Sequence, residues 1–335
     1  METDLPSELR AGLDRAMQGV SRNALIARAG AISQAYRAGG NSADAIHSAN
    51  DALAYALTRL PATFAAVAAV LGELRRVLPD FAPRTLLDVG AGPATAAWAA
   101  VRYFTGLDQI ELIDSNAPLR QLALDLMRFS RAPALRDARY DKGDAQQLIA
   151  FCKPADLNVA SYFIGEAPDS GLLQRADTLW SRTAGILVVI EPGTPAGFKR
   201  IRAIRSHLIG HGAFVVCPCP HDLECPMTSD DWCHFSQRLS RSRDHRIVKG
   251  AELPFEDEKY SYVALSRQKP VALAFDRVLA PPHVTKSAIT AKLCTPDGLV
   301  MDVAARRDRD AYKARKDWRW GDAVTRRQES VGGGE

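Results

Sequence analysis

Residues 86–95 read LLDVGAGPAT and join a short apolar run to a turn that contains Gly90 and Gly92, after which a helical pattern begins. Glycine lets the backbone approach a ligand closely, and the free N–H groups of a following helix can face a polar or anionic group. A ligand is therefore expected at the carboxyl end of this strand. Ala94 or Thr95 stands where a dinucleotide fingerprint has its third small residue. Because glycine turns between a strand and a helix are widespread, the turn alone does not identify the ligand.

Outward from this turn, short apolar runs alternate with helical segments. Residues 85–89, 109–113, 157–160 and 185–190 predict buried strands, and residues 94–104, 117–129 and 172–180 predict helices between them. This alternation indicates a parallel sheet with right-handed crossovers. The expected fold class is α/β, with an N-terminal helical region at 1–80, a doubly wound Rossmann-like domain at 81–212 and a Cys-rich, β-containing region at 213–330.

The two flanking regions differ in texture. Before residue 80 the sequence is rich in Ala, Leu and Arg, and a helix predicted after Pro61 carries one apolar stripe formed by Phe64, Val67, Leu71, Leu74 and Leu78. We expect this helix to pack on the next domain. After residue 214, strand-like pieces at 260–265, 271–275 and 299–303 predict a smaller β-rich region.

Three acidic residues accompany the glycine turn. Asp114 ends the second predicted strand about 20 residues after the turn, where a carboxylate can accept hydrogen bonds from ribose hydroxyls. Asp144 follows a third predicted strand and could contact an adenine amine, and Asp88 could orient the turn or hold the far end of a cofactor through water. The predicted cofactor-binding residues are therefore Asp88, Gly90, Gly92, Asp114 and Asp144.

A second cluster lies in CPCPHDLEC and the following WCH, which contain Cys217, Cys219, Cys225 and Cys233. Four cysteines this close in a chain with no visible secretory signal are more often metal ligands than chance core residues, and such a chain argues against a disulfide framework. Five residues separate Cys219 from Cys225 and seven separate Cys225 from Cys233. This spacing is unlike the paired Cys-x2-Cys of a zinc ribbon, and an iron–sulfur cluster tolerates it. Zinc stays open, and Cys294 is the remaining candidate ligand.

Two family resemblances rest on these residues. LDVGAGPAT resembles the first motif of class I S-adenosylmethionine-dependent methyltransferases, and Asp114 and Asp144 match that family's later acidic positions. Together with CPCPHDLECPM, DWCHFSQR and PFEDEKYSYVALSR, the chain from about residue 61 to 320 resembles the methyltransferase-like small-ribosomal-subunit assembly family. That family includes a mitochondrial assembly factor and bacterial relatives, and the chain resembles a bacterial member.

The resemblance implies a class I methyltransferase fold and two cofactors. One is S-adenosyl-L-methionine, and the other is a [4Fe-4S] cluster held by Cys219, Cys225, Cys233 and Cys294, the last from the LCTPDG segment. Cys217 is then a spare thiol or an alternate ligand.

Composition agrees with an ordinary globular chain. The 335 residues are 47% hydrophobic and 24% charged, with a formal net charge of +4, which excludes a mainly disordered chain and a collagen-like fibre. The longest apolar stretch, residues 62–71, is about half of the ~20 residues needed to cross a bilayer, so neither a transmembrane helix nor a membrane partner is expected. Since no secretory signal is visible, a cytoplasmic location is expected.

Basic residues gather in three groups despite the mild net charge. They lie at residues 199–205, 238–249 and 306–327, and the last group interleaves with Tyr312, Trp318 and Trp320. Such a mixture can neutralise phosphates and stack on unpaired bases. The predicted partner is small-subunit ribosomal RNA or the pre-ribosomal small subunit.

The chemistry itself is less determined by the sequence. Residues 160–166 read ASYFIGE where many amine methyltransferases carry an Asn-Pro-Pro-aromatic element, and Cys152 has no recognisable supporting base. Cys152 is interpreted as a structural thiol, and no catalytic residue is assigned. The leading hypothesis is a Rossmann-type methyltransferase-like protein that carries an iron–sulfur cluster and acts on, or with, the small ribosomal subunit during its maturation. Whether it is an enzyme that methylates rRNA is left open at this point. The alternatives are a non-catalytic RNA-binding assembly factor with a structural or redox-sensing cluster, and a zinc-stabilised methyltransferase for a small molecule or protein.

Overall fold

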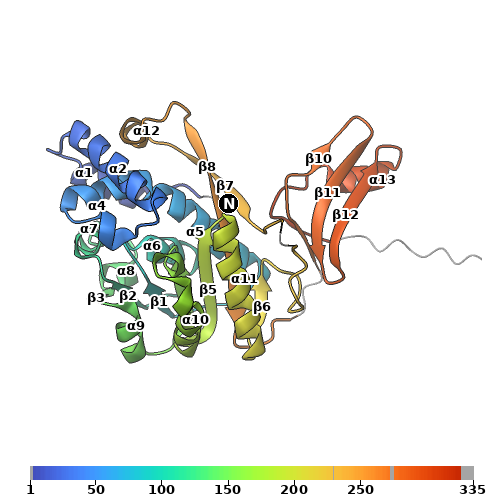
Figure 1. Ribbon diagram of the computed structural model, residues 1–335, viewed down its shortest axis with the longest axis horizontal. Helices are drawn as coiled ribbons and strands as arrows, with labels where there is room; N and C mark the ends of the chain where they lie inside the picture. The colour runs from blue at the N-terminus through green and yellow to red at the C-terminus, as the bar shows by residue number, and fades with distance from the viewer. Residues whose placement is uncertain (1–2, 229, 272–274, 326–335) are drawn as a thin grey trace, which may run out of the picture.

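The computed structural model describes residues 3–228, 230–271 and 275–325 (Figure 1). Within these residues the chain forms two β-sheets, and the cysteine-rich segment lies between them. Helices cover both faces of the larger sheet, whereas the smaller sheet lies at one end of the molecule with a single labelled helix, α13 (Arg309–Arg315), beside it.

The larger sheet confirms the predicted α/β class. Its strands are β1 (Thr85–Val89), β2 (Gln109–Asp114), β3 (Arg139–Lys142), β4 (Ala155–Ser161), β5 (Thr183–Pro192), β6 (Phe214–Cys217), β7 (Phe235–Ser240) and β8 (Phe255–Ser266). Their order is β3-β2-β1-β4-β5-β8-β6, with β7 paired to β8. The first five strands are parallel, and β8 is antiparallel to its neighbours. The direction of winding reverses between β1 and β4, which opens a crevice at their carboxyl ends.

Successive side chains of the larger sheet pack into two different cores. Leu86 belongs to the core under α5 (Leu60–Val77) and α6 (Thr95–Tyr103). Leu87 and Val89 belong to the core under α10 (Leu172–Ser181) and α11 (Pro195–Gly210). The helices after β1 are α6 (Thr95–Tyr103), α7 (Ala117–Met127), α8 (Pro133–Arg136), α9 (Ala145–Leu148), α10 (Leu172–Ser181) and α11 (Pro195–Gly210), with a short α12 (Arg243–Lys249) between β7 and β8. All three predicted crossover helices are therefore present.

The N-terminal region is helical, as predicted. It consists of α1 (Ser7–Ala16), α2 (Arg22–Arg37), α3 (Ser42–Ala45), α4 (Ala49–Thr58) and α5 (Leu60–Val77). Nearly every side of α5 is buried, because the helix packs on α6 and also against β8, so its apolar surface is wider than the single predicted stripe. Among the described residues, no single helix is both long and apolar enough to span a membrane, and only α4 and α5 taken together, across a 52° bend, reach that length and composition.

The strand β8 changes the expected organisation. Residues 260–265 were expected in the smaller β-rich region, but β8 fills the place between β5 and β6 in the larger sheet. The expected boundary at residue 212 therefore divides a continuous sheet.

The smaller sheet has the order β10-β11-β9-β13, with β12 paired to β11. Its strands are β9 (Asp276–Val278), β10 (His283–Val284), β11 (Ala288–Thr295), β12 (Gly298–Ala305) and β13 (Ala323–Val324). The strand predicted at 299–303 is present as β12, and the one predicted at 271–275 includes residues 272–274, which lie outside the described residues.

Candidate functional site

The glycine turn has the backbone that its sequence predicts. Gly90 and Gly92 have φ angles of +72° and +53°, in the left-handed region that favours glycine. A Cβ atom on Gly90 would also lie 2.6 Å from Cβ of Phe163, so a larger residue would be both strained and blocked. The turn consequently brings the backbone of β1 close to the segment that follows β4.

A pocket lies at the carboxyl ends of β1, β2 and β4. It encloses about 440 Å³ of space between atoms, part of it open to solvent. Its lining includes Gly90, Gly92 and Asp114, which are three of the five predicted cofactor residues, and also Ser42, Tyr55, Thr63, Ala91, Pro93, Thr95, Leu119, Ser161, Tyr162, Phe163 and Glu166.

Asp114 fastens the glycine turn to the end of β2. Its Oδ2 accepts a hydrogen bond from the Gly92 N–H at 2.8 Å, and its Oδ1 accepts one from the Asn116 N–H at 2.7 Å. Burial raises the pKa of this carboxyl, and the backbone N–H groups act against that rise. A carboxylate has about four acceptor positions, so Asp114 keeps capacity for a ligand hydroxyl.

The other two predicted carboxylates do not line the pocket. Asp88 is fully buried beneath the turn, where its Oδ2 accepts a hydrogen bond from the Ala97 N–H at 3.2 Å near the start of α6. Asp144 is exposed and caps α9 by accepting a hydrogen bond from the Gln147 N–H at 3.1 Å. Asp88 thus supports the turn from below, and Asp144 serves its own helix.

A segment of the N-terminal region covers the pocket, which the sequence did not indicate. Glu166 accepts hydrogen bonds from the Ser42 hydroxyl at 2.8 Å and the Tyr36 hydroxyl at 3.3 Å. The Asn116 amide donates to the carbonyl oxygens of Ser42 and Ile46 at 3.1 and 3.0 Å. The capping boxes at Asn41 and Ser48 mark helix starts but carry no information about this contact.

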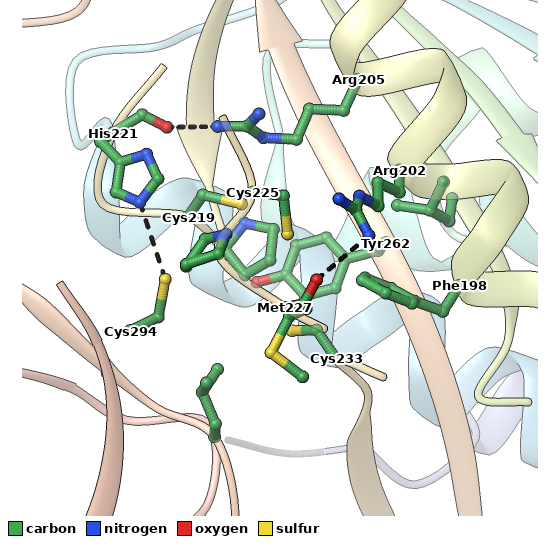
Figure 2. A pocket seen from close by; sticks show the side chains of 14 residues that line it. Phe198, Arg202, Arg205, Cys219, His221, Cys225, Met227, Cys233, Tyr262 and Cys294 are labelled. Atoms are coloured by element: carbon green, nitrogen blue, oxygen red, sulfur yellow. Dashed lines mark hydrogen bonds between the residues drawn. The ribbon is translucent and has the colours of Figure 1, made fainter. Parts of the chain in front are cut away.

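The four cysteines predicted as metal ligands line one cavity. Figure 2 shows Cys219, Cys225, Cys233 and Cys294 around it, the first three from the segment between β6 and β7 and the last from β11 of the smaller sheet. About 490 Å³ of space lies between the lining atoms, part of it open to solvent. Apolar side chains complete much of the wall, namely Phe198, Ile201, Pro218, Pro226, Met227, Tyr262 and Leu279.

The donor set of this cavity fits a soft metal or an iron–sulfur cluster. Burial raises the pKa of the thiols of Cys219 and Cys233, and that of Cys294 to about 12. A thiol must lose its proton to bind metal, so a bound cation would offset the penalty of burying these anions. Two buried arginines also face this region, and neither Nε of Arg205 nor Nη2 of Arg277 has a hydrogen-bond partner among the described residues.

The four thiols are not drawn tightly together. Among the described residues, one ligand atom each from Asp177, His207 and His211 lie within 4.8 Å of one another, and no three of the four cavity thiols do. Because thiolates are ligands of both zinc and iron–sulfur clusters, this donor set fits either group.

The remaining two cysteines lie outside the cavity lining. Cys217 is fully buried in β6, and burial raises the pKa of its thiol to about 12. Cys152 is half-buried, with its thiol 3.6 Å from the Leu148 carbonyl oxygen, and burial raises its pKa to about 11. Both thiols are consequently protonated at neutral pH, which agrees with a structural role.

The three basic groups differ in their surroundings. Arg202 and Arg205 turn inward and donate to the carbonyl oxygens of Met227 and His221, and Arg200 pairs with Glu191 and Asp169. In the second group, Arg238 pairs with Asp257, and Arg241 and Lys249 pair with Glu256. The third group is largely exposed around β12 and α13, at Arg306, Arg307, Arg309, Lys313, Lys316 and Arg319; Arg326 and Arg327 lie outside the described residues.

Two solved structures similar to this chain are named as methyltransferases. An O-methyltransferase family protein from Burkholderia thailandensis covers 70% of this chain and 64% of its own, at 11% identity and a TM-score of 0.44. Magnesium protoporphyrin IX methyltransferase from Synechocystis, solved with bound SAM, covers 63% of this chain and 84% of its own, at 10% identity and a TM-score of 0.40.

Sequence relatives point to one family. The human mitochondrial ribosome assembly protein METTL17 is 30% identical over 290 residues, which are 81% of this chain and 62% of that protein. The mitochondrial Rsm22-cox11 tandem protein 2 of Schizosaccharomyces pombe is 23% identical over 81% of this chain and 42% of its own length. The chain thus spans between 42% and 62% of the length of these relatives. Because the family model described as mitochondrial small ribosomal subunit Rsm22 matches residues 49–325, the chain belongs to the Rsm22 family.

Proposed function

We propose that this protein acts in assembly of the small ribosomal subunit and holds a [4Fe-4S] cluster through Cys219, Cys225, Cys233 and Cys294. The observation that carries the cluster proposal is the convergence of these four thiols, from segments about 60 residues apart, on one cavity. Membership of the Rsm22 family, and a relative named as a ribosome assembly protein, support the assembly role.

The chain's own residues would hold such a cluster in place. A bound [4Fe-4S] cluster would supply a compact inorganic core that links β11 to the segment between β6 and β7. Arg205 donates to the His221 carbonyl oxygen at 2.7 Å and so fixes the loop between Cys219 and Cys225. Phe198, Met227 and Leu279 exclude water from one side of the cavity.

We further propose that the pocket at the glycine turn binds S-adenosyl-L-methionine. Gly90 and Gly92 allow the backbone to approach the ligand, and Asp114 is the carboxylate available to its ribose. If methyl transfer occurs, an RNA atom would attack the sulfonium methyl in line, with catalysis mainly from positioning. Calorimetry with S-adenosylmethionine tests this: saturable binding of about one molecule per chain supports the proposal, and no heat at millimolar cofactor contradicts it.

A non-catalytic assembly factor is the second candidate. Two features of the pocket favour this candidate. Phe163 lies against Gly90, and the segment with Ser42 covers the opening, so both restrict the room for a cofactor and a substrate. Mapping modified bases of small-subunit RNA in a deletion strain separates the two candidates. A missing methyl group assigns the enzyme activity, whereas a normal pattern with defective subunits assigns the assembly role alone.

The proposed RNA contact is the exposed basic face around β12 and α13. Because phosphate contacts depend on charge, the double substitution R307E/R309E is expected to weaken co-sedimentation with small-subunit particles and to flatten its salt dependence. The matched control, R10E/R37E, changes two exposed arginines of α1 and α2 and should leave binding unchanged. Equal loss in both variants would indicate only a general charge effect and would remove this face from the proposal.

A further inference from the structure

A second metal-ligating group lies on the outer side of α10 and α11, apart from the cysteine cavity. One ligand atom each from Asp177, His207 and His211 lie within 4.8 Å of one another. His207 and His211 are four residues apart in the last turn and at the end of α11, and Asp177 belongs to the adjacent helix α10. We propose that these three side chains bind one divalent cation of the zinc class and thereby tie the end of α11 to α10.

The local geometry favours two imidazole ligands. Residues four apart on a helix lie on the same face, and the two rings are 4.4 Å apart between centroids. Nδ1 of His211 lies 2.8 Å from the His207 carbonyl oxygen, which can only accept a hydrogen bond, so Nδ1 is the donor. In the neutral ring Nε2 then carries the free lone pair, and the backbone carbonyl holds the ring in position, as it does for metal-bound histidines.

Asp177 supplies the anionic ligand. Its Oδ1 lies 2.6 Å from Nε2 of His207, and half of its side chain is exposed, so a cation and its remaining water ligands can enter from solvent. Ligand–metal bonds of about 2.0–2.2 Å need only small side-chain movements from this arrangement. The carboxyl end of α11 adds the partial negative charge of a helix C-terminus, which also attracts a cation.

This group is separate from the proposed cluster. At about 100° per residue on a helix, His207 points roughly 200° away from Arg205, which lines the cysteine cavity. Two imidazoles and one carboxylate form a mixed nitrogen and oxygen set that suits Zn²⁺, whereas the cavity offers thiols. A cation here would stiffen the far end of the helix whose other face supplies Phe198, Ile201 and Arg205 to that cavity.

Zinc titration of the full chain tests the proposal. The anaerobically purified protein and the variant H207A/H211A both keep the cysteine cavity, so the difference in Zn²⁺ bound at equilibrium dialysis reports this group alone. We expect the variant to bind about one Zn²⁺ fewer per chain, and D177N to bind this ion at least roughly tenfold more weakly. H283A, which removes a single exposed histidine of β10, is the matched control and should match the unchanged protein.

A second readout keeps the test independent of folding defects. In the unchanged protein, the imidazole ¹⁵N resonances of His207 and His211 should shift together and saturate with the first equivalents of Zn²⁺, and those of His283 should not. Equal zinc stoichiometry in the unchanged protein and H207A/H211A, or separate shifts of the two histidines only at large zinc excess, would overturn the proposal.

Discussion

Arg205 is a buried cation on the wall of the cysteine cavity. Burial raises the pKa of the thiols of Cys219 and Cys294, and the positive charge of Arg205 acts against that rise. Only 3% of Arg205 is exposed, so solvent screens this charge weakly. The same residue therefore holds the loop through His221 and stabilises anionic sulfur in the cavity.

Replacement of Arg205 by Gln should weaken retention of the proposed cluster. Hydrogen bonds to charged groups contribute about 1.5–3 kcal/mol, so an iron chelator should strip the variant roughly tenfold or more faster than the unchanged protein. Loss of a nearby positive charge should also lower the reduction potential. Arg202→Gln is the control, since Arg202 lines the same cavity and donates to the Met227 carbonyl oxygen. Equal rates and potentials in the two variants would contradict this role.

Asp88 should make stability depend on pH. Burial raises the pKa of Asp88 to about 7, against about 3.9 in an unfolded chain. Between these values the folded chain holds a proton that the unfolded chain has lost, so the stability contributed by this group falls as the pH rises from about 4 to 7 and is constant above. The asparagine of Asp88→Asn cannot ionise, so its unfolding free energy should not show this fall. Relative to the unchanged protein, the variant should therefore gain on the order of 2 kcal/mol of unfolding free energy as the pH rises from 5 to 8. Urea unfolding at several pH values measures this difference, and a difference that stays constant from pH 5 to pH 8 would refute the prediction.

At the scale of elements, Asn116 connects two helices to the pocket. Its Oδ1 caps α7 by accepting a hydrogen bond from the Leu119 N–H at 3.0 Å. Its Nδ2 donates to the carbonyl oxygens of Ser42 and Ile46, at the two ends of α3. Asn116→Asp keeps the capping oxygen but removes the amide donor. Hydrogen exchange at residues 41–47 should therefore speed up in this variant while α7 keeps its protection. Unchanged exchange at 41–47 would show that other contacts hold the cover.

Some of these elements could be predicted from the sequence alone, and others could not. The strand at Thr85–Val89 matches its predicted bounds, because a short apolar run ending in a glycine turn has few alternatives. The place of β8 could not be predicted, since its pairing with β5 and β6 joins residues far apart in the chain. The ligand contact of Asp144 stays a prediction, because a carboxylate that caps its own helix has the same sequence signature as one that faces a ligand.

For the whole molecule, a buried ion pair joins the smaller sheet to the N-terminal region. Arg277 of β9, of which 1% is exposed, lies 2.7 Å from Glu73 of α5 and donates to the carbonyl oxygens of Pro218 and Gly321. Neither residue carried a signal in the sequence, because their pairing depends on how the two sheets meet. By contrast, the convergence of Cys294 with the other three cysteines was expected, because Cys294 was the remaining candidate ligand in the sequence and the family resemblance included it in the set.

Arg277→Met should cost about 3–5 kcal/mol of unfolding free energy, because it removes the buried cation beside Glu73, which then keeps only Arg76, and leaves the carbonyl oxygens of Pro218 and Gly321 without their donor. The matched control is Arg76→Met, which removes the half-exposed partner of the same Glu73 and should cost about 1 kcal/mol or less. Urea unfolding of both variants measures the difference, and similar losses would mean that the pair with Arg277 is not the contact that joins the sheets.

The most direct test of the account is to measure iron, acid-labile sulfide and zinc per chain in the anaerobically purified protein. The account predicts about four irons and four sulfides per chain. It also predicts their loss in Cys294→Ser and their retention in Cys152→Ser, whose thiol lies outside the cavity. A protein that contains zinc without iron, or a Cys294→Ser variant with full iron and sulfide, would contradict it.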